Sequence, residues 1–189
     1  MLKGDLRTAR SGFDRALEMD SEDPLNWKFS GEAHMRLENY QIGLQHLEKA
    51  VKGLPNDAIV WHNRGMAFYE LGRVDEAIRS LSRGIELNPR QGGGGSYFWR
   101  ARAYSLQGKA GEAIADYSSL INVNPGYLWA WRNRADLRYS VGDMVGAFKD
   151  FEHVAKTRPR DLDMDWFLWT LSGIESGKKP QELLFALRS

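Results

Sequence analysis

The sequence predicts an all-α protein built from repeated pairs of antiparallel helices. Residues 58–91 hold two amphipathic segments, each with apolar or small residues three and four positions apart, which gives each helix one face to bury. A glycine, Gly72, separates the two segments, and Pro89 ends the second. The same pattern recurs along most of the chain, so neighbouring pairs can cover one another's apolar faces.

The repeat appears as columns of similar residues at a nearly constant spacing. One aromatic column advances by 34, 36, 34 and 35 residues: Trp27, Trp61, Tyr97, Trp131 and Trp166. A turn column comprises Gly4, Glu38, Gly72, Gly108, Gly142 and Gly177, and a proline column comprises Pro55, Pro89, Pro125 and Pro159. Small residues recur at Gly31, Gly65, Ala101 and Ala135, and again at Ala9, Gly43, Ala77, Ala113 and Ala147. Agreement of several columns at one period indicates a repeat protein.

Each column has a physical reason. Small residues let the two helices of a pair approach closely. Glycine after the first helix can adopt the left-handed conformation that closes a helix. Proline cannot continue the second helix. Tryptophan supplies large contact area where consecutive pairs meet.

The pattern resembles the tetratricopeptide repeat family. The residues that carry the resemblance in 58–91 are Trp61, Gly65, Phe68, Gly72, Ala77, Leu81 and Pro89, with their equivalents in the columns above. The resemblance covers nearly the whole chain. It implies a right-handed α-solenoid whose first helices line a concave groove and whose second helices form the convex back.

We expect a single solenoid over residues 1–189. Its four full repeats are 24–57, 58–91, 94–127 and 128–161, preceded by a half repeat at 1–23 and followed by a degenerate capping unit at 162–189. The apolar segment 166–171 must be covered on more than one face, and a last helix at 181–187 is the expected cover. The alternative is a contact between copies of the chain. The missing first helix of the half repeat leaves open a truncated start or an edge covered by a partner.

Two departures from the pattern affect local structure. Glu38-Asn39 replaces the turn glycine, and we expect Asn39 to adopt the left-handed conformation there. The run Gly92-Gly93-Gly94-Gly95-Ser96 inserts two residues at one repeat junction. Because glycine disfavours a helix start, we expect the next helix to begin at about Ser96, with Ser96 as its N-cap. This run reads equally as an engineered linker or as a native flexible loop.

Composition restricts the function. The net charge is +1 over 189 residues, so bulk electrostatics does not favour nucleic acid as a partner. The chain has no cysteine, and its sequence shows neither a signal peptide nor a membrane-spanning run, which together favour a cytoplasmic location.

No residues form a catalytic or metal-binding pattern. His34, His46, His62 and His153 lack the helical spacing of a metal pair, and His34 falls in a core column. Gly108-Lys109 and Gly177-Lys178 lack the serine or threonine of a phosphate-binding loop. We therefore predict no catalytic residue, no cofactor and no metal.

The predicted functional surface is the concave groove. Its expected lining, counted from the tryptophan column, is Lys28, Phe29, Glu32, His62, Asn63, Met66, Tyr69, Phe98, Trp99, Arg102, Trp129, Arg132, Asn133, Asp136 and Tyr139. Aromatic, methionine and arginine side chains are enriched in protein interfaces. The alternative for Trp99 and Trp129 is packing between repeats or against a terminal helix.

Some family members hold a peptide C-terminus in a clamp of lysine and asparagine residues. Lys28 and Asn63 match that pattern, whereas Glu32, Gly95 and Trp99 depart from it, so we do not expect a complete clamp. The leading hypothesis is a non-catalytic interaction scaffold that binds a peptide or helix of a partner protein. The alternatives are a self-assembling scaffold, a regulatory segment of a larger protein, and an engineered or stitched solenoid.

Overall fold

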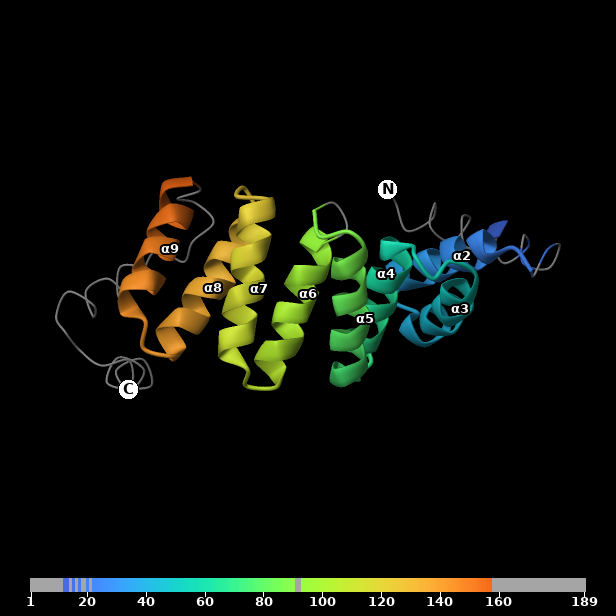
Figure 1. Ribbon diagram of the computed structural model, residues 1–189, viewed down its shortest axis with the longest axis horizontal. Helices are drawn as coiled ribbons and strands as arrows, with labels where there is room; N and C mark the ends of the chain where they lie inside the picture. The colour runs from blue at the N-terminus through green and yellow to red at the C-terminus, as the bar shows by residue number, and fades with distance from the viewer. Residues whose placement is uncertain are drawn as a thin grey trace. The chain divides into compact units, whose positions relative to one another are not determined.

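The structure is a computed structural model that describes residues 22–90 and 93–157, together with the isolated residues Gly12, Phe13, Arg15, Leu17 and Asp20. All its regular elements within these ranges are α-helices, which confirms the predicted fold class. The chain divides into two compact units, residues 1–108 and 109–189. Figure 1 shows the helices of both units.

Unit 1 contains five helices within its described residues. They are α2 (Pro24–Arg36), α3 (Tyr40–Gly53), α4 (Ala58–Glu70), α5 (Val74–Leu87) and α6 (Gly93–Leu106). The helices α2 and α3 form one pair, α4 and α5 form the next, and α6 packs on both α4 and α5. Each of the two pairs is joined by a short turn, as expected for antiparallel neighbours.

Unit 2 contains three described helices. They are α7 (Ala110–Val123), α8 (Leu128–Ser140) and α9 (Met144–Thr157). The helix α8 packs against both α7 and α9 (Figure 1).

The core follows the small-residue columns. Gly31 and Gly65 face leucines of the following helix so closely that an added Cβ would stand 2.8 Å and 2.5 Å from Leu47 Cγ and Leu81 Cγ. These leucines are fully buried, and Phe68 beside them is 1% exposed. The predicted close approach of paired helices is therefore present in both pairs of unit 1.

The turn between paired helices takes a left-handed residue in each described case. Gly72, Gly108 and Gly142 have φ of 74°, 70° and 88°, as the glycine column predicts. In the first repeat the residue with positive φ is Glu38, at 63°, whereas Asn39 has φ of −84°. The expectation for Asn39 was wrong, because the left-handed residue directly follows Leu37, the C-cap of α2, and Asn39 already serves as the N-cap of α3.

The start of α6 also differs from the expectation. The helix begins at Gly93 rather than near Ser96, and Ser96 lies inside it. Ser96 is fully buried, and its Oγ is 3.0 Å from His62 Nδ1 of α4. An added Cβ at Gly95 would lie 2.8 Å from His62 Cε1. Close packing of α6 on α4 thus favours glycine here, in spite of its weak intrinsic helix propensity.

An arginine column that the sequence analysis did not identify joins helices in both units. Arg64, Arg100 and Arg134 each stand three residues after the aromatic column, and each guanidinium lies 5.0–5.9 Å from that aromatic ring. Each also donates to a serine of another helix, at distances of 2.8–3.0 Å: Arg64 to Ser80, Arg100 to Ser82 and Arg134 to Ser118. These arginines therefore connect neighbouring helices through charge-assisted hydrogen bonds.

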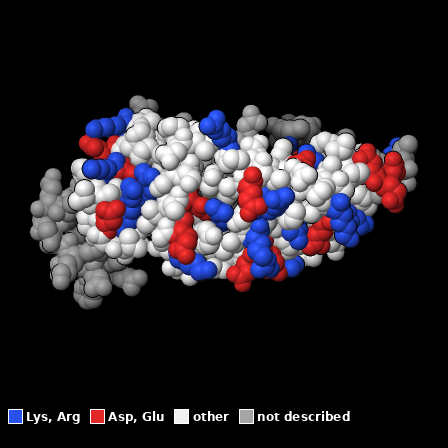
Figure 2. Space-filling model, viewed as in Figure 1, with Lys and Arg blue, Asp and Glu red and all other residues white. Residues whose placement is uncertain are grey.

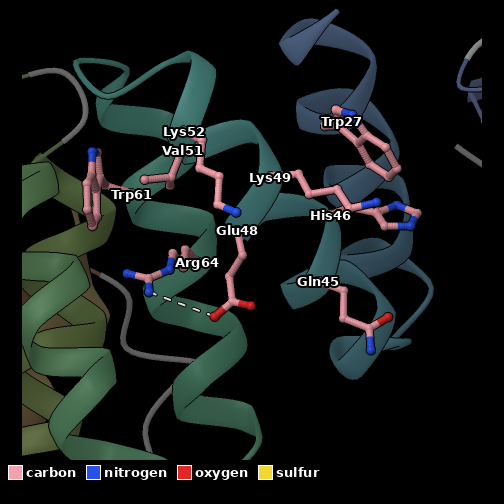
Figure 3. Close-up of a pocket in the computed structure, with 9 residues that line it drawn as sticks. All are labelled: Trp27, Gln45, His46, Glu48, Lys49, Val51, Lys52, Trp61 and Arg64. Atoms are coloured by element: carbon pink, nitrogen blue, oxygen red, sulfur yellow. Dashed lines mark ion pairs between the residues drawn. The ribbon is translucent and has the colours of Figure 1, made fainter. Parts of the chain in front are cut away.

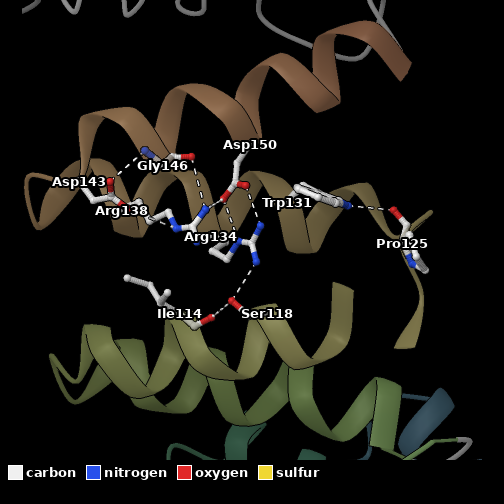
Figure 4. Close-up of polar contacts among 9 residues, drawn as sticks. All are labelled: Ile114, Ser118, Pro125, Trp131, Arg134, Arg138, Asp143, Gly146 and Asp150. Carbon is white, nitrogen blue, oxygen red and sulfur yellow. Dashed lines mark hydrogen bonds and ion pairs between the residues drawn. The ribbon is translucent and has the colours of Figure 1, made fainter. Parts of the chain in front are cut away.

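In unit 2 the arginine of this column, Arg134, also pairs with a buried carboxylate. Asp150 of α9 is 1% exposed and accepts from Arg134 Nη2 at 2.7 Å and Nε at 2.8 Å, the fork geometry of a bidentate pair. Arg138 Nη1 donates to the same carboxylate at 2.8 Å (Figure 4). One buried aspartate thus ties α8 to α9.

The capping unit at 162–189, its helices at 166–171 and 181–187, and most of the half repeat at 1–23 lie outside the described residues.

Candidate functional site

A hollow of about 650 Å³ opens over the first helices of unit 1. We call it the first-helix hollow, and its lining is Lys28, Phe29, Glu32, Met35, Arg36, Tyr40, Ile59, Asn63, Met66, Glu70 and Trp99. All but Tyr40 come from α2, α4 and α6, which are the helices expected to line the groove. Six residues of the predicted lining are brought together here: Lys28, Phe29, Glu32, Asn63, Met66 and Trp99.

The wall of this hollow is largely apolar. Phe29 is 39% exposed and Ile59 is 49% exposed. Met66 is partly buried against the core, and Met35 is buried. Exposed aromatic and aliphatic side chains beside flexible methionines are typical of surfaces that bind varied apolar side chains.

Two of its polar side chains, Lys28 and Asn63, are paired within the chain. Lys28 Nζ lies 2.7 Å from Asp57 Oδ2, and Asn63 Nδ2 donates to Glu32 Oε1 at 3.3 Å. The two residues that match the family's carboxylate clamp are thus engaged within the chain. This pairing adds a structural reason to the sequence departures against a complete clamp.

Burial and neighbouring polar groups shift the pKa values of Glu32 and Asp57 in opposite directions. Burial raises the pKa of Glu32, although Lys28 and Arg36 partly oppose the shift. Burial alone would also raise the pKa of Asp57, but the Lys28 hydrogen bond and the backbone N–H groups of Ile59 and Val60 hold it below its ordinary value. Asp57 is therefore a firm N-cap for α4.

An aromatic–arginine cluster, formed by Tyr69, Phe98, Trp99 and Arg102, adjoins the hollow through Trp99. Trp99 meets the Tyr69 ring edge-on, with centroids 5.1 Å apart, and the Phe98 ring at 5.7 Å. The Arg102 guanidinium lies 4.9 Å from the Trp99 ring, 5.0 Å from Tyr69 and 5.7 Å from Phe98. Stacking on rings orients the guanidinium and leaves its N–H groups for a further acceptor.

His62 lies in the seam between α4 and α6 rather than along the first-helix hollow. Burial lowers its pKa to about 4, so the imidazole is neutral at pH 7.

The remaining predicted residues belong to α8 in unit 2. Trp129 is 61% exposed, with the Arg132 guanidinium 5.8 Å from its ring and Asn133 Nδ2 bonded to its carbonyl at 2.6 Å. The Asp136 carboxylate reaches solvent, yet partial desolvation by the surrounding protein, opposed by Arg132, raises its pKa to about 6. Tyr139 packs against the small core of α8 and α9, and burial raises its pKa. These residues all belong to α8, and none of them lines the first-helix hollow.

Sequence reasoning missed Tyr40 as a lining residue. It is the first residue of α3, directly after the turn, whereas the groove positions were counted only on first helices. Partial desolvation, together with Glu70 and Glu38, raises its pKa.

Two further findings limit the chemistry. No group of three or more potential metal ligands occurs within residues 22–90 and 93–157. Over the same ranges, no helix combines the length and apolarity needed to cross a bilayer.

The class of protein defined by this fold is an α-helical repeat protein with an aromatic hollow over its first helices. Two models described as "Tetratricopeptide repeat" match residues 58–91 and 94–127. These two stretches are therefore tetratricopeptide repeats, as the sequence pattern predicts.

Solved structures support the same fold. A crystal structure of MamA gives a TM-score of 0.76 at 23% identity, covering 82% of this chain and 89% of that chain. YrrB, a tetratricopeptide repeat protein with an unusual peptide-binding site, gives 0.71 at 20% identity, covering 83% and 80%. At these identities the likeness concerns the fold alone.

Curated relatives are matched over part of their length. A tetratricopeptide repeat and J domain-containing co-chaperone of Cryptococcus neoformans is 29% identical over 105 residues, which is 56% of this chain and 20% of the relative. Serine/threonine-protein phosphatase 5 of Mus musculus is 30% identical over 97 residues, which is 51% of this chain and 19% of the relative. The match thus spans about a fifth of the length of each relative.

Proposed function

We propose that the chain is a non-catalytic scaffold that binds a segment of a partner protein in the first-helix hollow. Tetratricopeptide repeat proteins generally act as scaffolds for protein–protein interaction. The observation that supports this site is the hollow itself, with exposed Phe29 and Ile59 on its wall and the aromatic–arginine cluster at Trp99.

The apolar wall of the hollow and the nearby Arg102 indicate what kind of partner segment binds there. Apolar side chains of the partner fill the space between Phe29, Ile59 and Met66, where burial of apolar surface supplies the affinity. Arg102 carries no carboxylate partner within the described residues, so it orients the segment through an acidic side chain or a backbone carbonyl. A helix or an extended peptide with apolar anchors and modest acidity fits these features.

In unit 2 the exposed Trp129 and its neighbours Arg132, Asn133 and Asp136 supply a second contact surface of the same kind. We assign them to the same partner, with Trp129 as the main apolar contact. Tyr139 supports the helix that presents them.

The test starts from peptides selected from a random display library on the immobilised protein, with affinities measured by calorimetry. Trp99→Ala should weaken a selected peptide by tenfold or more, since buried aromatic anchors each contribute about 2 kcal/mol or more. Arg102→Ala should weaken it severalfold. Trp129→Ala tests the contribution of unit 2 separately.

Leu106→Ala is the matched control, because Leu106 is a 63% exposed apolar residue of α6 that does not line the hollow. It should leave the affinity unchanged. Equal affinity of the Trp99→Ala and parent proteins, both folded by circular dichroism, contradicts the proposed site.

A further inference from the structure

A second hollow of about 650 Å³ lies over α3 of unit 1. We call it the second-helix hollow, and its lining is Trp27, Gln45, His46, Glu48, Lys49, Val51, Lys52, Trp61 and Arg64. Figure 3 shows the outer side chains of α3 between Trp27 of α2 and the Trp61 and Arg64 side chains of α4. The second-helix hollow shares no residue with the first-helix hollow.

Its charges are unbalanced. Three cationic side chains, Lys49, Lys52 and Arg64, face one carboxylate, Glu48. Lys52 is exposed and has no ion pair within the described residues, and Lys49 Nζ lies 3.7 Å from the centroid of the Trp27 ring. Glu48 is 3.9 Å from Arg64 Nη2, beyond hydrogen-bond distance. The hollow therefore carries a local positive charge in a chain whose net charge is only +1.

Arg64 is less completely paired than its counterpart in unit 2. Arg134 has the buried Asp150, 16 residues later, as a bidentate partner. The residue 16 positions after Arg64 is Ser80, whose hydroxyl accepts one bond from Arg64 at 3.0 Å. Arg64 Nη2 has an ion-pair contact with Glu48 Oε1 at 3.9 Å but no hydrogen bond within the described residues, and the Arg64 side chain keeps 24% of its surface exposed. The Arg64 Nε also lacks a hydrogen-bond partner, but it is buried and out of reach of a ligand. A guanidinium whose donors are partly unused is a site for an added carboxylate.

The two tryptophans give the hollow aromatic walls. Trp61 is fixed by a hydrogen bond from its Nε1 to the Pro55 carbonyl at 2.8 Å, and Trp27 packs edge-on against His46 at 5.0 Å. Both rings are only partly buried, so an apolar side chain can pack on the exposed part of either. Rigid aromatic surface beside cationic groups is a frequent composition of protein-binding sites.

We propose that the second-helix hollow is a separate docking site for an acidic segment of a partner protein. Carboxylates of that segment pair with Arg64 and Lys52, and an aliphatic side chain packs on Trp61. An acidic segment complements the three cations and one carboxylate of the hollow, and its carboxylate can bond Nη2 of the partly exposed Arg64 side chain. The face viewed in Figure 2 interleaves acidic and basic side chains instead of forming the continuous basic stripe that a nucleic acid needs.

The probe is a fluorescein-labelled synthetic peptide in which glutamates flank two leucines, measured by fluorescence anisotropy. The double variant Lys49→Glu/Lys52→Glu should weaken binding by about tenfold or more, because like charges then face the peptide. The control is Lys149→Glu/Lys156→Glu on α9 of unit 2, which changes the net charge equally and should leave affinity within twofold. A peptide with glutamine in place of glutamate should bind at least tenfold more weakly than the glutamate peptide.

A second variant, Ser80→Asp, tests the role of Arg64 without adding charge inside the hollow's lining. It places an internal carboxylate where Arg134 has Asp150, so the affinity for the acidic peptide should fall severalfold while circular dichroism stays unchanged. Unchanged affinity in Ser80→Asp contradicts the role of Arg64.

Three further results overturn the proposal. The first is an equal loss of affinity in the Lys149→Glu/Lys156→Glu control. The second is a loss in Trp99→Ala with none in Lys49→Glu/Lys52→Glu, which places the peptide in the first-helix hollow. The third is displacement of the peptide by inorganic phosphate or by a single-stranded oligonucleotide at the same charge concentration, which indicates a general anion site.

Discussion

Arg64 of α4 and Arg134 of α8 occupy the same position in two repeats, yet their surroundings differ. Arg134 is 8% exposed and shares the buried Asp150 with Arg138. Arg64 bonds Ser80, remains partly exposed and lines a hollow. The same repeat position can therefore have two roles. An arginine there holds helices together where a buried acid is present, and it leaves hydrogen-bond donors at the surface where that acid is absent.

The largest effect is expected at Asp150. Replacing it with alanine leaves the buried Arg134 without its acid and removes one of the two carboxylate partners of Arg138, which should lower the free energy of unfolding by about 3–5 kcal/mol. Urea denaturation followed by circular dichroism measures the change. Ser80→Ala in unit 1 removes only a hydroxyl partner of Arg64 and should cost about 1 kcal/mol. Equal costs in the two variants contradict the comparison.

The small-residue column gives the next effect. An alanine Cβ at Gly65 would stand 2.5 Å from Leu81 Cγ and 3.1 Å from the Leu81 backbone nitrogen, so Gly65→Ala should destabilise by about 2–3 kcal/mol. Ala135 holds the equivalent position in α8 and is buried without such a restriction. Ala135→Gly should cost about 1 kcal/mol through helix propensity alone. A stabilised Gly65→Ala protein, as judged by urea denaturation, contradicts this account of the pair.

A pH-dependent effect belongs to unit 1. His62 is held neutral with a pKa of about 4, against an ordinary value of 6.5, whereas the equivalent residue of α8 is Arg132. Between pH 4 and pH 6.5, His62 therefore binds a proton in the unfolded chain but stays neutral in the folded chain. The packing of neutral His62 stabilises the fold fully above pH 6.5, and this stability is lost as the pH falls toward 4. At pH 5 the free energy of unfolding is lower by an amount on the order of 2 kcal/mol.

His62→Gln is the matched variant for this effect, since glutamine does not titrate. Urea denaturation at pH 7.5 and at pH 5 should show a smaller loss of stability in His62→Gln than in the parent protein. The difference between the two proteins cancels the titration of His34, His46 and His153. Identical losses in the two proteins argue against a neutral buried His62.

The smallest effect concerns the turn after α2. Glu38 has φ of 63°, in a position that Gly142 holds in unit 2 with φ of 88°. Glu38→Gly should raise stability by up to about 1 kcal/mol, because glycine adopts this conformation without a steric penalty. Gly142→Ala should lower it by a similar amount. Differential scanning calorimetry of both variants measures the shifts, and a lower melting temperature for Glu38→Gly contradicts the strain assigned to Glu38.

Much of the fold could be predicted from periodic residues. The positions of Gly31 and Gly65 against Leu47 and Leu81 follow from size alone, because only small residues permit the observed approach. The start of α6 could not be predicted, since Gly95 is favoured there by its close contact with His62 of another helix. Local propensity carries no information about such a contact.

The candidate site was predicted in part. Counting from the tryptophan column located Phe29, Asn63 and Trp99 on one hollow, because equivalent positions of first helices face the same side. The role of Arg64 was missed, although an arginine three residues after the aromatic column at Arg64, Arg100 and Arg134 was a visible signal. The contacts that these arginines make depend on Ser80 and Asp150, which lie on other helices.

Photo-cross-linking from the first-helix hollow tests the central proposal most directly. A photoreactive phenylalanine analogue at Ile59, which is 49% exposed and lines the hollow, should cross-link a selected peptide efficiently. The same analogue at Val123 of α7, which is 39% exposed, is the control and should give little product. A strong cross-link from Val123 with none from Ile59 contradicts binding in the first-helix hollow.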